Sequence, residues 1–77
     1  PMAYVEAVVR GSPAEAAGVL PDDLVFRIVV QGDERTIRTC RDFDDALAAR
    51  QPGDRVRLVL KRGDTMRAVE LELVAGG

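Results

Sequence analysis

The chain has 77 residues, a length that makes one small domain, and we expect it to be a fragment of a longer protein because it begins Pro1-Met2. Its 47% hydrophobic and 31% charged residues are typical of a globular domain, and its net charge of -2 argues against nucleic-acid binding. No apolar run approaches the roughly 18 residues of a membrane span. With no histidine and one cysteine, the chain lacks the usual general base, the commonest metal ligand and an internal disulfide.

The chain begins with a predicted strand and a very short helix. Ala3–Arg10 is mostly apolar and rich in β-formers, which favours a strand. The next eight residues carry the signals of a complete helix. These signals are the N-cap Ser12, Pro13 at the first helical position, Glu15 three residues after the cap, and Gly18 at the end.

Two further strands are predicted after this helix. Asp22 and Asp23 follow a proline, and we expect them to shape a turn rather than bind a metal ion. The apolar run Leu24–Val30 has the length of a strand. A turn is predicted at 31–34, and Arg35–Arg38 is predicted to form a short edge strand.

A longer helix is predicted to begin after Thr39 and to end before the Pro-Gly pair at 52–53. Asp42 lies three residues after Thr39, the spacing of a capping box. Phe43 and Leu47 lie four residues apart and should face the core.

The last part of the chain predicts a hairpin. Arg55–Lys61 and Arg67–Val74 both alternate apolar and polar residues, and a turn is expected at 62–65. Glu70 and Glu72 are expected to pair with the basic residues of the first strand, Arg55, Arg57 or Lys61. The order of elements predicts a small α+β domain, a bent and mainly antiparallel sheet capped by two helices.

No pattern in the sequence predicts catalysis. Asp44 and Asp45 are adjacent on a helix and therefore point in different directions. Ser12 has no histidine to activate it, and Cys40 has no partner. We therefore expect no catalytic residue, no metal site and no cofactor.

The motif from Gly11 to Leu24 resembles the core of a PDZ domain. It consists of Gly-Ser-Pro-Ala, then Ala-Gly-Val, then Asp22-Asp23 before an apolar strand, where most such domains read Gly-Asp. The resemblance covers essentially the whole chain and implies a single domain over residues 1–77, a PDZ-like partial barrel with a circularly permuted strand order. The opening Pro-Met-Ala-Tyr-Val and the double aspartate resemble the proteasome non-ATPase regulatory subunit nine family, which chaperones assembly of the regulatory particle. The alternative is a regulatory PDZ domain of a bacterial envelope serine or site-2 zinc protease.

The resemblance implies a binding site and a partner. PDZ domains bind the C-terminus of a partner as an added strand, in a groove beside the longer helix. By position, the residues implied to line this groove are Asp42, Ala46, Ala49 and Arg50. The implied partner is the C-terminal peptide of a proteasomal ATPase subunit, in the cytoplasm and the nucleus, or a peptide in the bacterial periplasm under the alternative. No contact with nucleic acid or membrane is implied.

The glycine-rich loop that holds the peptide carboxylate in this family has no counterpart in the sequence. We expect it to lie before Pro1 or after Gly77. A sheet edge left without its neighbour recruits other chains, so we expect self-association through that edge, or weak affinity for peptide.

Overall fold

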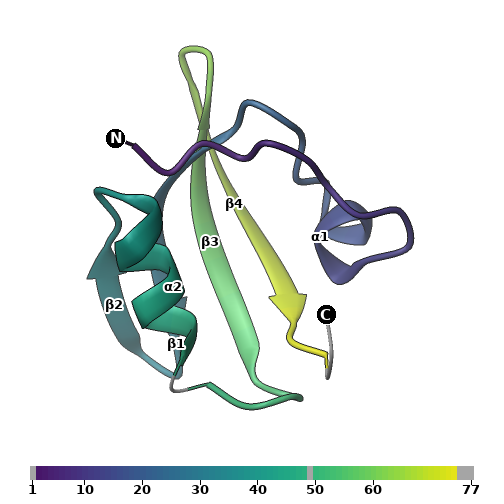
Figure 1. Ribbon diagram of the computed structural model, residues 1–77, viewed down its shortest axis with the longest axis vertical. Helices are drawn as coiled ribbons and strands as arrows, with labels where there is room; N and C mark the ends of the chain where they lie inside the picture. Colours follow the sequence, from purple (N-terminus) through teal and green to yellow (C-terminus); the bar gives the residue numbers. More distant parts are fainter. Residues whose placement is uncertain (1, 49, 75–77) are drawn as a thin grey trace.

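The computed structural model describes residues 2–48 and 50–74. In chain order its elements are α1 (Pro13–Ala17), β1 (Leu24–Val30), β2 (Asp33–Thr36), α2 (Cys40–Ala48), β3 (Arg55–Arg62) and β4 (Thr65–Glu72). The strands form one open antiparallel sheet of order β2-β1-β3-β4, with α2 over the β1–β2 side and α1 beside β4 (Figure 1). This architecture confirms the predicted small α+β fold.

The predicted short helix is confirmed as α1. Ser12 accepts a hydrogen bond of 3.2 Å from the N–H of Glu15, and Gly18 ends the helix at a φ of 93°. The return bond differs from a standard capping box, because the Glu15 carboxylate accepts from the N–H of Gly11 (3.0 Å).

The predicted strand Ala3–Arg10 is wrong. This segment makes only an isolated bridge, between Tyr4 and Leu24. Val5 exchanges hydrogen bonds of 2.8 Å with the backbone of Asp22 and Asp23. Residues 6–10 have no described strand beside them, because the chain that precedes β1 forms a turn. A β-forming sequence makes no ladder of hydrogen bonds without such a neighbour.

The edge strand β2 begins two residues earlier than predicted. Gln31 and Gly32 both have positive φ, 51° and 81°, which makes a two-residue hairpin turn between β1 and β2. The four-residue turn predicted at 31–34 is therefore too long, and β2 covers Asp33–Thr36 rather than Arg35–Arg38.

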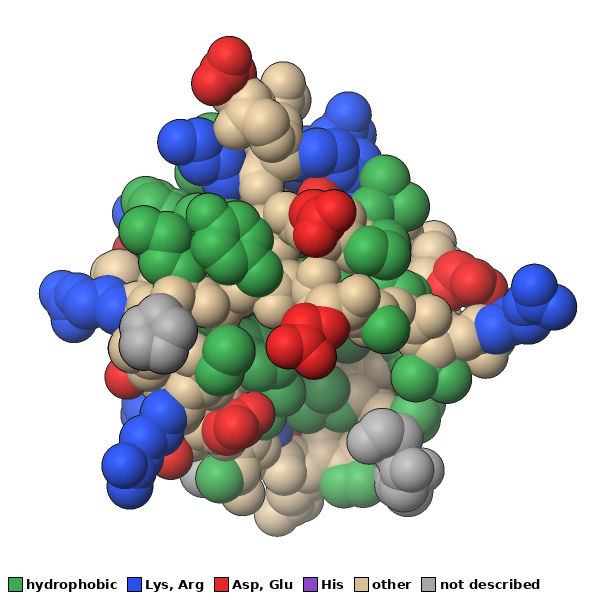
Figure 2. All heavy atoms as spheres, turned by 45° about the horizontal axis from the view of Figure 1, so that its top comes forward, with side chains coloured by type: hydrophobic (Ala, Val, Ile, Leu, Met, Phe, Trp, Pro, Cys, Tyr) green, Lys and Arg blue, Asp and Glu red, His purple; other side chains and the backbone are tan. Residues whose placement is uncertain are grey.

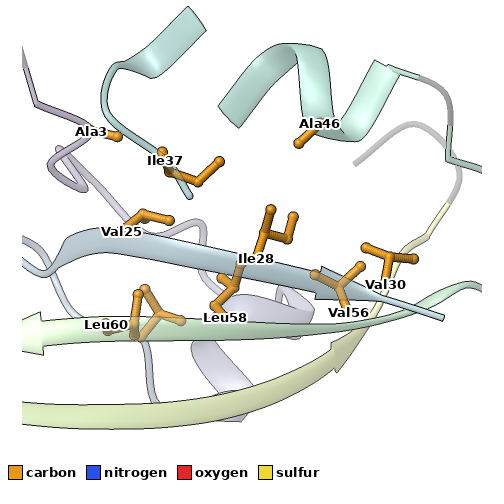
Figure 3. Close-up of a cluster of buried hydrophobic side chains, with 10 residues drawn as sticks. Ala3, Val25, Ile28, Val30, Ile37, Ala46, Val56, Leu58 and Leu60 are labelled. Carbon is orange, nitrogen blue, oxygen red and sulfur yellow. The ribbon is translucent and has the colours of Figure 1, made fainter. Parts of the chain in front are cut away.

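The core lies between α2 and the sheet. Phe43 and Leu47 pack against it as predicted. Ala46 of α2 is 3% exposed and points toward Ile28 and Val30 of β1 (Figure 3). The buried hydrophobic residues are Ala3, Val19, Val25, Ile28, Val30, Ile37, Ala46, Val56, Leu58 and Leu60.

The predicted hairpin is confirmed as β3 and β4, although β4 begins at Thr65 rather than Arg67. Glu70 bonds Arg57 at 3.0 Å and lies 3.8 Å from Arg55, so the expected cross-strand pairing holds for Glu70. Among the described residues, neither helix has the length and apolar character needed to cross a membrane.

Candidate functional site

An apolar groove separates the N-terminal segment, residues 3–8, from the beginning of α2. Its volume is about 490 Å³. Figure 2 shows hydrophobic side chains within a recess and acidic side chains close to it. The groove is lined by Ala3, Tyr4, Val5, Glu6, Ala7, Val8, Ala14, Val19, Val25, Cys40, Phe43, Asp44 and Leu58.

One wall of the groove carries free backbone groups. Ala3 and Val5 direct their hydrogen bonds toward residues 22–25. Because successive residues of an extended chain direct their backbone groups to opposite sides, those of Tyr4 and Glu6 face away from β1. Within residues 2–48 and 50–74, the N–H groups of residues 6–9 donate no hydrogen bond. This wall can therefore accept a further strand.

The opposite wall is the first turn and a half of α2. Cys40, Phe43 and Asp44 lie three and four residues apart, which places them on one face of the helix. The start of α2 is fixed by a full capping box. The N–H of Asp42 donates to Thr39 Oγ1 (3.2 Å), and the Asp42 carboxylate accepts from the N–H of Thr39 (3.2 Å) and of Arg38 (3.0 Å).

The structure places the predicted groove residues elsewhere on α2 and after it. Asp42 is engaged in the capping box, and Ala46 is buried against β1. Arg50 donates to Asp33 Oδ2 at 3.1 Å, which ties the end of α2 to the start of β2. Ala49 lies outside the described residues. None of the other three lines the groove found here, and their role in peptide binding stays a prediction.

No sequence pattern predicted a site at residues 4–8 or at Cys40, Phe43 and Asp44. The signal that could have found the helix residues is their own spacing of three and four residues, which puts them on a different face of α2 from Asp42 and Ala46. Residues 4–8 were not recognised because their β-forming residues predicted a strand already paired within the sheet.

An ion pair between Asp23 and Arg62 stabilises the turn between α1 and β1, which lies beside the groove. Asp23 is fully buried, and Arg62 at the end of β3 donates to both of its carboxylate oxygens at 2.7 and 2.8 Å. Arg62 also donates to the carbonyl of Gly18, and the N–H of Leu20 donates to Asp23. The hydrogen bonds from Arg62 lower the pKa of Asp23, with burial acting in the opposite direction.

The two aspartates therefore shape the turn, as predicted. Asp22 adopts a φ of 73°, in the left-handed region that favours glycine, and this explains why glycine is usual at the first of the two positions. Asp23 aligns residues 22–25 with the N-terminal segment, because its carboxylate joins the α1–β1 turn to β3. Among the described residues, no three histidine, cysteine or acidic side chains form a set that could hold a metal ion.

Comparison with known proteins agrees with this geometry. A family model of the PDZ domain matches residues 1–73. No curated protein matches the chain. PDZ domains are generally non-catalytic interaction modules that bind the C-terminal peptides of partner proteins. Since the match spans nearly the whole sequence, the chain belongs to the PDZ domain family.

Proposed function

We propose that the groove between residues 3–8 and α2 binds the C-terminal residues of a partner protein in an extended conformation. The observation that carries this proposal is the pairing of an apolar hollow with a backbone edge whose N–H groups at residues 6–9 are free among the described residues. An extended peptide supplies the missing strand partner, and its side chains alternate toward and away from the hollow. Backbone bonds thus give affinity, while the hollow selects an apolar side chain.

The proposed partner is the C-terminal tail of a proteasomal ATPase subunit, bound by an assembly chaperone of the regulatory particle in the cytoplasm and nucleus. This finer proposal rests on the opening residues and on the Asp22-Asp23 pair. The second candidate is substrate sensing by a bacterial envelope protease in the periplasm. ATPase-tail peptides compared with unrelated peptides of equal hydrophobicity separate the two, because only an assembly chaperone should prefer the tails.

Peptide titration tests the binding function itself. A labelled C-terminal peptide with an apolar last residue should bind in the micromolar range. Cys40→Arg should weaken binding at least about tenfold, because Cys40 is exposed at the groove and a long side chain there occupies it.

Ala48→Arg is the matched control for this variant. Ala48 is also exposed on α2 but does not line the groove, so the same new side chain should leave the affinity unchanged. Equal affinities for Cys40→Arg and the unmodified chain, with equal melting temperatures, would exclude this groove as the binding site.

A further inference from the structure

Within residues 2–48 and 50–74, the charged residues that line the groove are all acidic. These residues are Glu6 on the N-terminal segment and Asp44 on α2, which face the hollow from its two walls. Neither makes a salt bridge within the described part of the chain. The carboxylates elsewhere that do pair include Asp23 with Arg62 and Glu70 with Arg57. Among the described residues, the groove lining therefore carries two carboxylates without a salt-bridge partner.

The remaining lining residues are mainly apolar, whereas Glu6 and Asp44 are both exposed. Their interaction with a charged ligand is therefore modest and sensitive to salt. In the view of Figure 2, acidic side chains lie among the hydrophobic ones near the middle, and Lys and Arg side chains lie toward the periphery. A ligand that enters this groove meets a negative potential.

We propose that the groove selects extended C-terminal peptides that carry a lysine or arginine within a few residues of an apolar last side chain. This inference rests on the proposed function, and it adds the chemistry of the ligand. A peptide terminal carboxylate is repelled by Glu6 and Asp44, since the lining offers no basic side chain. A basic side chain on the same peptide offsets that repulsion and pairs with Asp44 or Glu6.

Three peptides that share an apolar last residue test the proposal on the 77-residue chain. They carry lysine, glutamine or glutamate at the same internal positions. The lysine peptide should bind about 5- to 10-fold more tightly than the glutamine peptide, and the glutamate peptide more weakly than either. Added salt should reduce the lysine preference, because the groove is open to water.

Two substitutions connect the preference to the groove. Asp44→Asn and Glu6→Gln remove the charge with little change of shape, and each should reduce the preference for the lysine peptide over the glutamine peptide about 3-fold. Asp45→Asn is the matched control. Asp45 is the next residue of α2 and is exposed, but it does not line the groove, so its loss should leave the preference intact.

The outcomes separate the two proposals. If the glutamine peptide binds and the lysine peptide binds no better, the inference about charge is wrong and the proposed function stands. If Asp45→Asn lowers the preference as much as Asp44→Asn, the effect comes from net charge, and the assignment to the groove is overturned. If no peptide binds, the proposed function fails and this inference fails with it.

Discussion

At the scale of single residues, Asp23 stabilises the turn beside the groove. Its buried carboxylate accepts bonds from Arg62 and from the N–H of Leu20. Asp23→Asn removes the charge of the pair and leaves the Arg62 guanidinium poorly matched. We expect the free energy of unfolding at pH 7, measured by urea denaturation, to fall by about 2 kcal/mol. Asp22→Asn is the control, since Asp22 is exposed and asparagine tolerates its left-handed backbone, and we expect a change within about 0.5 kcal/mol.

The same residue gives a pH dependence. Folding lowers the pKa of Asp23 below its ordinary value of 3.8, chiefly through the hydrogen bonds from Arg62. A lowered pKa means that the stabilisation is complete above the unfolded-state pKa and is lost as the pH falls through the folded-state pKa. The stability difference between the unmodified chain and Asp23→Asn should therefore be largest at neutral pH and should shrink in strong acid. A difference that stays constant down to about pH 2 would contradict the assigned role of the charge.

At the scale of elements, the sequence predicts best where its signals are local. The caps of α1 and α2, the alternation of β3 and the apolar run of β1 all depend on residues within one element, and each is confirmed. The prediction failed for residues 3–10, because pairing depends on a neighbour that the local sequence cannot report. The ends of β2 shifted for a related reason, since Gln31 adopted a positive φ that its residue type does not announce.

Substitution of Asp42 tests whether this residue only caps α2 or also contacts the peptide. Its carboxylate accepts from the N–H groups of Arg38 and Thr39, so Asp42→Ala should lower the free energy of unfolding by about 1 kcal/mol through loss of the α2 cap. Thr39→Ala removes the reciprocal half of the same box and should cost a similar amount. We expect the two variants to match in peptide affinity, measured by titration at a temperature where both are folded. An affinity loss confined to Asp42→Ala would instead support the contact with peptide that the family resemblance implies.

At the scale of the whole molecule, the place of the binding site stays a prediction, and the hollow found here has other lining residues than the groove that the resemblance implies. The family resemblance indicated the side of the longer helix, and the hollow lies beside α2. It also led to residues on another face of that helix, such as Asp42, which caps it, and Ala46, which packs into the core. The face that borders the hollow is the one opposite the N-terminal segment, and the backbone bonds of Val5 with residues 22–23 hold that segment in place.

The free N–H groups at residues 6–9 predict that copies of the chain associate weakly. The described sheet ends in β2 and β4, but β2 is short and its side chains are mostly charged, which discourages pairing. The N–H groups of residues 6–9 have no such protection among the described residues, and residues 6–8 border an apolar hollow. A contact of this length buries less than the roughly 1,000 Å² of a stable interface, so dimers should form only near millimolar concentration.

Sedimentation velocity over a wide concentration range measures this association. A saturating C-terminal peptide should dissociate the dimer, because it occupies the same edge. A chain that stays monomeric at the highest concentration, or a dimer that persists with bound peptide, would show that this edge does not recruit a second copy.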